Sequence, residues 1–351
     1  MLLVIFGAGA SFDSFPECPP EKVLPALRPP LAANHYENDR PPLANQLFDN
    51  RPNFIEAMTR FPDCLPLIPQ LRRAGVVVER ELADLQQQAA TFPPAHRELA
   101  AIRFYLHFAL WECQKAWSKR HRGITNYSAL LREIERWRFC SNERVCFVTF
   151  NYDTMLEQAI AQVLKTNFAD FRDYVSHDDY KLMKLHGSID WGHEFDWKGA
   201  PTNPQAVIDA AVDLRIGVGF RKVTQHPMVF SDGAIGSPAL SIPVQEKDEL
   251  ECPSEHVEEL ARVIPNVTQI ITIGWRATEG KFLAMLSKRL TGLQGAPDPF
   301  IVSGDKSGAD ETLHNLGKTE HGFAPVEGGF TGLINNMSLL DRFLSPRGPN
   351  N

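Results

Sequence analysis

The first eleven residues of the chain constrain its fold more than any other segment. Five apolar residues run directly into Gly7-Ala8-Gly9, a pattern that predicts a short buried strand followed by a tight turn. Glycine lacks the Cβ atom that would keep a pyrophosphate away from backbone N–H groups, and Ser11 adds a hydroxyl donor beside them. The turn is therefore either a seat for a nucleotide phosphate or an ordinary turn between a strand and a helix.

The residues after this turn depart from the dinucleotide-binding fingerprint of dehydrogenases. Phe12 stands where the fingerprint has a third glycine, and no second strand ending in an acidic residue follows about 20 positions later. The segment 15–42 holds eight prolines instead, which exclude a long helix or a central strand. This segment is a candidate lid over the turn, in which Arg40 is either a phosphate ligand or a solvated side chain.

The composition is that of a globular chain, with 351 residues of which 43% are hydrophobic and 23% charged. Its net charge of −7 and pI near 5.9 argue against a nucleic-acid-binding surface. No apolar run approaches the ~20 residues that span a bilayer, so we expect a cytoplasmic protein. The six cysteines include no Cys-x-x-Cys pair, which predicts reduced thiols and no metal site.

Hydrophobic periodicity divides the chain into an α/β core and a helical insertion. Residues 43–138 show apolar positions at helical spacing and no recognisable strand, whereas strand patterns at 145–150, 181–185, 269–273 and 300–303 are each followed by loop or helix. We predict an α/β fold, a Rossmann-like parallel sheet with helices on both faces, formed by residues 1–42 and 139–345. Residues 43–138 form a large α-helical insertion. Residues 190–238 show no pattern that assigns their elements.

Small and polar residues follow the ends of the five predicted strands. They are Gly7, Asn151, His186, Gly274 and Ser303. In an open parallel sheet the ligand binds outside the carboxyl ends of the strands, so we expect these residues to meet around one site. A histidine there would act as a base near neutral pH. Asp153 is equally well suited to cap the helix that follows it.

Four segments, taken in this order and spacing, resemble the sirtuin-like proteins. They are Gly-Ala-Gly-Ala-Ser at 7–11, Thr-Phe-Asn-Tyr-Asp at 149–153, Leu-His-Gly-Ser at 185–188 and Ile-Gly-Trp at 273–275. They are most similar to the bacterial branch that hydrolyses NAD in anti-phage defence. The resemblance covers the α/β core and leaves the helical insertion without specific motifs. It departs from sirtuin deacylases, which carry a four-cysteine zinc module, because residues 192–240 contain no cysteine.

The resemblance implies NAD as substrate and assigns roles to the strand-end residues. The pyrophosphate would be held by Gly7, Gly9 and Ser11. Asn151 and Asp153 would face the nicotinamide and its ribose, and Gly274 and Ser303 would border the adenosine half. The expected NAD-binding set also includes Ala8, Gly187 and Trp275. His186, as base on a ribose hydroxyl, and Asn151 would be the catalytic residues.

These features predict an NAD⁺ hydrolase that forms nicotinamide and ADP-ribose in anti-phage defence. Two alternatives stay open, namely an NAD-dependent protein deacylase or ADP-ribosyl transferase, and a non-catalytic subunit that senses NAD or ADP-ribose. Unrestrained NAD hydrolysis would kill a cell, so we expect control by homo-oligomerisation or by a partner. The resemblance suggests a hexameric DNA-translocating ATPase or a helicase-like defence protein as that partner. No metal, no membrane contact and no sequence-specific nucleic-acid binding are expected.

Overall fold

The computed structural model describes residues 1–20, 37–73, 75–89, 91–196, 203–243, 250–290 and 296–345. Its central sheet has five parallel strands in the order β3-β2-β1-β7-β8. The strands are β1 (Leu2–Phe6), β2 (Val145–Thr149), β3 (Tyr180–Lys184), β7 (Gln269–Ile273) and β8 (Pro299–Val302). Their nearly continuous burial is typical of parallel strands that are covered on both faces.

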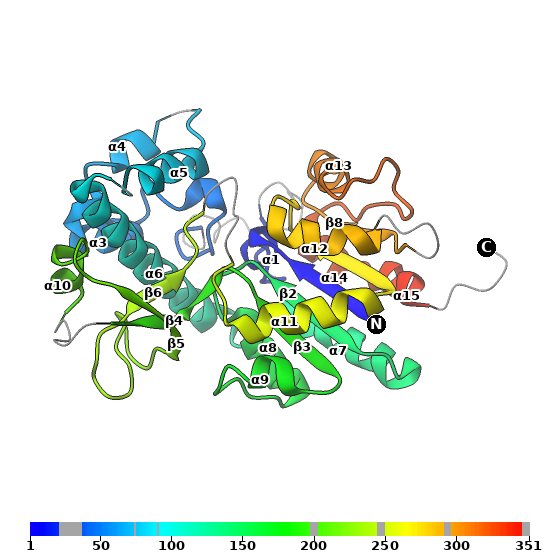
Figure 1. The fold of residues 1–351 in the computed structure, drawn as a ribbon. Helices are drawn as coiled ribbons and strands as arrows, with labels where there is room; N and C mark the ends of the chain where they lie inside the picture. The colour runs from blue at the N-terminus through cyan, green and yellow to red at the C-terminus, as the bar shows by residue number, and fades with distance from the viewer. Residues whose placement is uncertain are drawn as a thin grey trace.

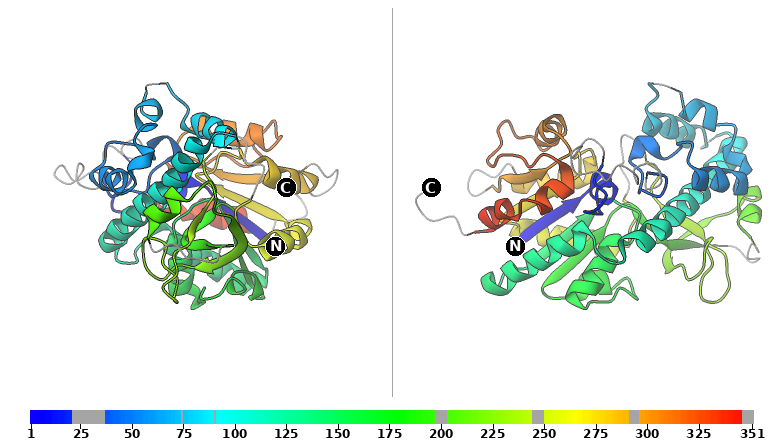
Figure 2. Two further views of the ribbon diagram at one scale, coloured as in Figure 1. Left: turned by 60° about the vertical axis from the view of Figure 1, so that its left-hand side comes forward. Right: turned by 180° about the vertical axis from the view of Figure 1, so that it is seen from behind.

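Helices cover both faces of this sheet (Figures 1 and 2). In the view of Figure 1, α11 (Ser254–Val263) and α12 (Gly280–Leu290) lie in front of it. The opposite face, seen from behind in Figure 2, carries α7 (Asn126–Ser141), α14 (Gly329–Ile334) and α15 (Met337–Leu344). The other helices around the sheet are α1 (Ala8–Phe12), α8 (Met155–Leu164), α9 (Asp173–Ser176) and α13 (Lys306–Asn315). The predicted α/β fold class is confirmed.

A second hydrophobic core lies beside the sheet, on the left of Figure 1. An antiparallel sheet of β4 (Gly187–Phe195), β5 (Ile216–Lys222) and β6 (Ser237–Leu240), in the order β5-β4-β6, contributes to it. The helices around it are α3 (Pro52–Arg60), α4 (Ile68–Leu71), α5 (Val78–Ala89), α6 (Pro93–His121) and α10 (Pro204–Asp209). Residues 190–238, which showed no pattern in the sequence, form α10 and much of this antiparallel sheet. Val207 and Ile208 of α10 lie in the second core, whereas Trp191 of β4 is buried in the core of the parallel sheet.

The long helix α6 takes part in both cores. It begins at Pro93, because proline is well suited to the first turn of a helix. Ile102 lies in the second core, whereas Trp117 is buried in the core of the parallel sheet. The buried face of α7, including Tyr127 and Ile134, also belongs to the sheet core. The predicted insertion, 43–138, includes most of α7, but α7 packs in the core of the parallel sheet. The bounds of the insertion stay a prediction.

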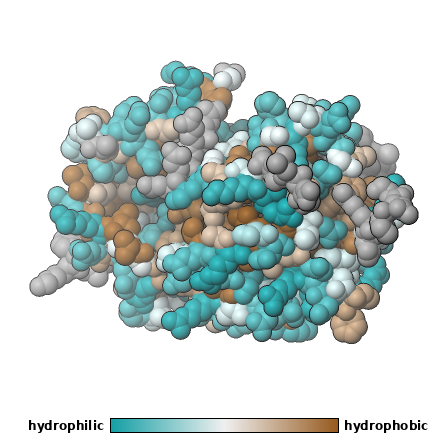
Figure 3. Space-filling model, turned by 45° about the vertical axis from the view of Figure 1, so that its right-hand side comes forward, coloured by the Kyte–Doolittle hydropathy of each residue, from teal (hydrophilic) through white to brown (hydrophobic). Residues whose placement is uncertain are grey.

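The described residues include no helix that is long and apolar enough to cross a membrane. The face shown in Figure 3 is largely hydrophilic, with apolar side chains visible in a strip between two hydrophilic ridges. Helix α11 illustrates how such a surface arises, because His256 and Leu260 are buried while Glu255 and Glu258 are exposed. Amphipathic helices of this kind shield the apolar sheet from water.

Two stacked histidines join α6 to the second sheet region. The Nε2 atom of His107 lies 2.7 Å from the carbonyl oxygen of Ile189, and its ring centroid lies 4.9 Å from that of His226. Burial lowers the pKa of His107 to about 4. Burial, together with the nearby His107, lowers the pKa of His226 to about 3. Both rings are therefore neutral in the folded protein at neutral pH.

We expect the free energy of unfolding to decrease as the pH falls from 6.5 towards 4. In this window the unfolded chain binds a proton at His107, whose ordinary pKa is 6.5, and the folded protein does not. This difference removes about 1.4 kcal/mol of stability per pH unit at most. Urea unfolding at several pH values checks the slope against His107→Gln, which keeps a donor for Ile189 and does not titrate. Equal slopes for the two proteins would contradict this explanation.

Candidate functional site

The carboxyl ends of the five parallel strands lie level with one another at one edge of the sheet. Phe6, the last residue of β1, is in register with Thr149 of β2 and Ile273 of β7. In turn Thr149 is in register with Lys184, and Ile273 with Val302. The residues that follow these positions are therefore neighbours across the sheet. The structure brings the ends of the five predicted strands together, as the sequence indicated.

The glycine turn after β1 packs directly against the end of β7. A Cβ atom on Gly7 would lie 2.5 Å from the carbonyl oxygen of Gly274, and one on Gly274, where φ is +58°, would lie 2.5 Å from the carbonyl carbon of Gly9. The amide of Gly9 donates to Gly274 O at 3.0 Å, and the amide of Ala10 donates to Gly7 O at 2.9 Å. Close approach of two backbones thus explains these glycines without a ligand, and their role as a phosphate seat stays a proposal.

Asn151 ties the end of β2 to the glycine turn. Its side-chain amide donates to Gly7 O and to Ser11 Oγ, at 2.9 Å in each case. The Ser11 hydroxyl donates to Asp153 Oδ2 at 2.6 Å. The hydroxyl of Tyr127 lies 2.9 Å from Ser11 Oγ and 3.2 Å from Asn151 Nδ2. Three predicted site residues therefore share one hydrogen-bonded cluster with Tyr127, which the sequence did not indicate.

This cluster leaves one polar atom of Asn151 for other contacts. Both N–H groups of the amide are directed at protein acceptors, and no described residue donates to Oδ1. The Asp153 carboxylate also has two uses, because Oδ1 accepts the amide of Met155 at 3.1 Å. Asp153 thus accepts the amide of the first residue of α8, as a capping role requires, although Thr154 occupies the N-cap position. Burial raises the pKa of Tyr127 well above its ordinary value, so its hydroxyl stays protonated as a donor.

His186 lies at the end of β3, where the chain leaves the parallel sheet for the antiparallel one. Its side chain is buried, with the ring 4.8 Å from that of Phe150 between centroids. Phe150 in turn stacks on Trp275 at 5.6 Å. His186 therefore packs against the residue that immediately precedes Asn151 in the chain. A Cβ atom on Gly187, where φ is +83°, would overlap the carbonyl oxygen of Ala239, so the turn into β4 requires glycine here.

The remaining predicted residues lie on the β7 and β8 side of the site. Trp275 is buried, its Nε1 donates to Glu279 Oε2 at 2.6 Å, and its carbonyl accepts the Thr312 hydroxyl at 2.8 Å. The amide of Ser303 donates to Val326 O at 2.9 Å, and its side chain is half-buried. Ala8 is half-buried at the start of α1. The structure brings all the predicted residues to one edge of the sheet.

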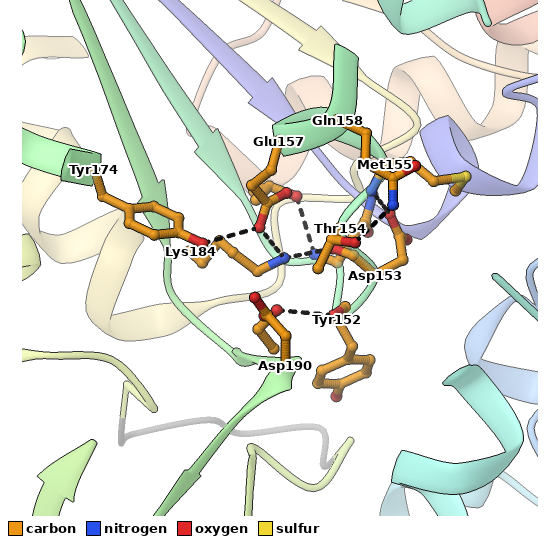
Figure 4. Close-up of polar contacts among 12 residues, drawn as sticks. Tyr152, Asp153, Thr154, Met155, Glu157, Gln158, Tyr174, Lys184 and Asp190 are labelled. Carbon is orange, nitrogen blue, oxygen red and sulfur yellow. Dashed lines mark hydrogen bonds and ion pairs between the residues drawn. The ribbon is translucent and has the colours of Figure 1, made fainter. Parts of the chain in front are cut away.

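The turn from Asn151 to Thr154 is held from several sides (Figure 4). Lys184 Nζ donates to the carbonyl oxygen of Asp153 and pairs with Glu157 Oε1 at 3.0 Å. Ile189 N donates to Tyr152 O at 2.9 Å. Thr154 exchanges two hydrogen bonds with Gln114 of α6, of 2.6 and 2.7 Å. The sequence did not indicate these supporting contacts, although a lysine at the end of an apolar strand was a visible signal.

Arg40 is buried and paired within the protein, so the predicted solvated role is wrong, and the phosphate role stays a prediction. Its buried guanidinium donates to Phe12 O at 2.8 Å, to Cys18 O at 3.0 Å and to both carboxylate oxygens of Glu37. These contacts fix the segment after α1, because a buried cation is stable only where its donors are paired. Most of the predicted lid, residues 21–36, lies outside the described residues.

The cysteines and the other metal-ligating side chains form no metal site in the described part of the chain. Cys18, Cys64, Cys113, Cys140, Cys146 and Cys252 are all free thiols. Groups of three or more His, Cys, Asp or Glu side chains that could hold an ion are absent among the described residues. The candidate site presents hydroxyl, amide, imidazole and carboxylate groups.

Comparisons with known proteins place the chain beside Sir2 homologues. No protein-family model matches it, and no curated protein matches. Among solved structures, a Sir2 homologue in complex with NAD aligns with a TM-score of 0.40 and 13% identity, covering 98% of this chain and 90% of that one. Sir2 bound to an acetylated peptide aligns with a TM-score of 0.39 and 11% identity, covering 98% and 94%. At these values the similarity carries no argument about the activity of this chain.

Proposed function

We propose that this chain hydrolyses NAD⁺ to nicotinamide and ADP-ribose. The observation that carries the proposal is the hydrogen-bonded cluster of Ser11, Asn151 and Asp153 at the carboxyl edge of the sheet, with His186 on the next strand end. Ligands of open parallel sheets bind at this edge. The four motifs that resemble sirtuin-like proteins supply these same residues, and they direct the proposal to NAD.

The residues present fit the groups that NAD would offer. Ser11, Asn151 and Asp153 provide hydroxyl, amide and carboxylate groups of the kind that bind ribose hydroxyls, and Asn151 Oδ1 is available as an acceptor. In the proposed site Ala8, Gly7 and Gly9 lie towards the pyrophosphate. Gly274, Trp275 and Ser303 border the adenosine half, and Gly187 adjoins His186 at the edge of the proposed site.

The reaction breaks the bond between the ribose anomeric carbon and the nicotinamide nitrogen. The bonding electron pair goes to nicotinamide, which leaves as a neutral base, and a water oxygen forms the new bond to carbon while one proton is released. His186 stabilises the positive charge that develops on the ribose by accepting a proton from a ribose hydroxyl. Asn151 orients the ribose or the attacking water, which lowers the entropic cost of the step.

Control of the activity is part of the proposal, since free NAD hydrolysis depletes a central metabolite. We propose a role in anti-phage defence, with activity restrained in a homo-oligomer or by an ATPase-like or helicase-like partner in the cytoplasm. Light scattering and activity measured on the same preparation test this. A monomer with full constitutive activity would contradict it.

The decisive experiment is chromatographic measurement of nicotinamide released from NAD by the purified protein. We expect nicotinamide and ADP-ribose in equal amounts, without any peptide. Consumption of NAD only with an acyl-lysine peptide would identify a deacylase instead, and transfer of ADP-ribose to protein would identify a transferase. Calorimetric binding of NAD with no product would identify a sensing subunit. The absence of both binding and release, including with the isolated oligomer, would overturn the proposal.

A further inference from the structure

Lys184 is a buried cation placed next to the proposed site. It is the last residue of β3, its side chain has no exposed surface, and His186 follows two residues later. An ammonium group removed from water is costly unless it is paired and hydrogen-bonded. A methionine would fill such a position without that cost. The contacts of the Lys184 ammonium therefore indicate why a charged residue is present here.

Those contacts join three elements at the edge of the sheet. Lys184 Nζ donates to the main-chain carbonyl of Asp153, in the turn after β2, and pairs with Glu157 Oε1 at 3.0 Å, in the first turn of α8. The side chain of Asp153 is the acceptor for Ser11. Figure 4 shows Lys184 between Glu157 and the turn that carries Asp153. One cation thus fixes the backbone that presents the hydrogen-bonded cluster.

Glu157 is itself held in place by a tyrosine. The Tyr174 hydroxyl lies 3.4 Å from Glu157 Oε1 and accepts a hydrogen bond from Lys222 at 2.9 Å. Lys222 also pairs with Asp190 at 3.0 Å. Two lysines and two acidic residues therefore form a charge-balanced group under the turn. With Glu157 held in this way, the Lys184 ammonium stays directed at the carbonyl of Asp153.

We infer that Lys184 and Glu157 are a positioning pair, which holds the Asn151–Asp153 turn in the orientation needed to bind and cleave the ligand. The inference rests on the proposed function. Because Lys184 ends β3 and His186 follows two residues later, the ion pair also fixes the position of the turn relative to His186, the proposed base. A purely structural role, in which the ion pair adds only stability, is the competing explanation.

Four variants separate these explanations. Lys184→Met leaves the Glu157 carboxylate buried without its cation, so it should lose stability and turnover together. The double variant Lys184→Met with Glu157→Gln removes both charges, so it should regain most of the stability. If Lys184 positions the turn, the double variant should still show a kcat roughly 10- to 100-fold below wild type, since small displacements of a site have effects of this size. Glu157→Gln alone leaves the buried Lys184 ammonium without its counter-charge, so it should also lose stability, and the double variant is the folded protein that tests the positioning role if Lys184→Met does not fold.

Lys181 supplies a matched control on the same strand. Its side chain donates to the carbonyl of Val175 at 2.6 Å and lies 3.5 Å from Glu259, but it contacts neither the turn nor its neighbours on α8. Because side chains alternate along a strand, it faces the other side of the sheet from Lys184. Lys181→Met should lose stability and keep a wild-type kcat.

The measurements are urea unfolding, kcat and KM for nicotinamide release, and NAD affinity by calorimetry. Recovery of wild-type kcat in the double variant, or an equal loss of kcat in Lys181→Met, would overturn the inference. If the wild type binds NAD but releases no nicotinamide, the hydrolase proposal fails. The positioning role is then tested by NAD affinity, and we expect the double variant to bind NAD at least about tenfold more weakly than wild type. A wild type that neither binds nor cleaves NAD would overturn both.

Discussion

Replacement of His186 by alanine is expected to reduce nicotinamide release from NAD by about 10²- to 10⁴-fold, the range that a positioned general base contributes. The imidazole lies at the end of β3 against Phe150, next to the strand end that carries Asn151. His186→Ala removes the proposed proton acceptor without altering the hydrogen bonds of Ser11 or Asp153. We expect the loss in kcat, with a smaller change in KM, when chromatographic rates are compared at saturating NAD.

A surface histidine controls for this result. His177 is exposed, and its Nδ1 accepts the amide of Asp179 at 3.2 Å, just before the amino end of β3 and thus at the other end of that strand from His186. His177→Ala should retain wild-type turnover. Because His186 is buried, His186→Gln serves as a second variant that fills more of the space and preserves packing. Near wild-type kcat in both His186 variants, with folding verified by circular dichroism, would exclude His186 as the base.

The parallel sheet was predictable because its strands carry strong local signals. Leu2–Phe6 and Val145–Thr149 are apolar almost throughout; Gly7 follows the first directly, and Asn151 comes two residues after the second. Such runs have few alternatives, since a continuous apolar segment of this length must be buried. Ligands lie at the carboxyl ends of parallel strands, and this rule places Asn151 and Gly274 at one edge of the sheet from their positions in the sequence.

The antiparallel sheet was not predictable, for reasons visible in its strands. In β4 the register shifts between His193 and Phe195, which breaks the alternation that identifies a half-buried strand. Most of β5 is exposed or half-buried, with Val218 96% exposed. The edge strand β6 has only four residues and contains Pro238. Pairing with β4, rather than local preference, makes these segments strands.

The site residues that follow strand ends were predictable from the sequence. The residues that hold them in place were not. Ser11 and Asp153 follow strand ends, so their convergence follows from the topology. Tyr127 comes from α7, 116 positions from Ser11, and no spacing in the sequence links the two. The contact of Lys184 with Glu157 likewise depends on how α8 packs against β3. The glycines do not distinguish a phosphate-binding turn from an ordinary one, because the packing of Gly7 against Gly274 requires glycine whether or not a phosphate binds.

Replacement of Asn151 by aspartate is expected to reduce turnover by roughly 100-fold or more and to destabilise the fold. The side chain keeps its shape, but a carboxylate cannot donate to Gly7 O or to Ser11 Oγ. It also places a second carboxylate on the Ser11 hydroxyl, which already donates to Asp153. Gly7 O keeps the amide of Ala10 as a donor at 2.9 Å, but the new buried carboxylate has lost the two hydrogen bonds that the amide donated, at a cost of about 1–3 kcal/mol. The turn would then shift relative to His186, and small displacements of this kind are costly for catalysis.

Asn126 allows the catalytic and structural parts of this effect to be separated. Its side-chain amide also donates to a carbonyl oxygen, that of Asp13, and to a hydroxyl, that of Thr331, at 2.6 and 2.9 Å. The Thr331 hydroxyl in turn donates to the Asp13 carboxylate at 2.5 Å, so the arrangement repeats that of Asn151, Ser11 and Asp153. Asn126→Asp should lose a similar amount of stability in urea unfolding and keep turnover within a few-fold of wild type, since Asn126 does not follow a strand of the sheet. Equal losses of kcat in the two variants would show that Asn151 acts only through stability, and the proposed role of its amide in orienting the ribose or water would then be wrong.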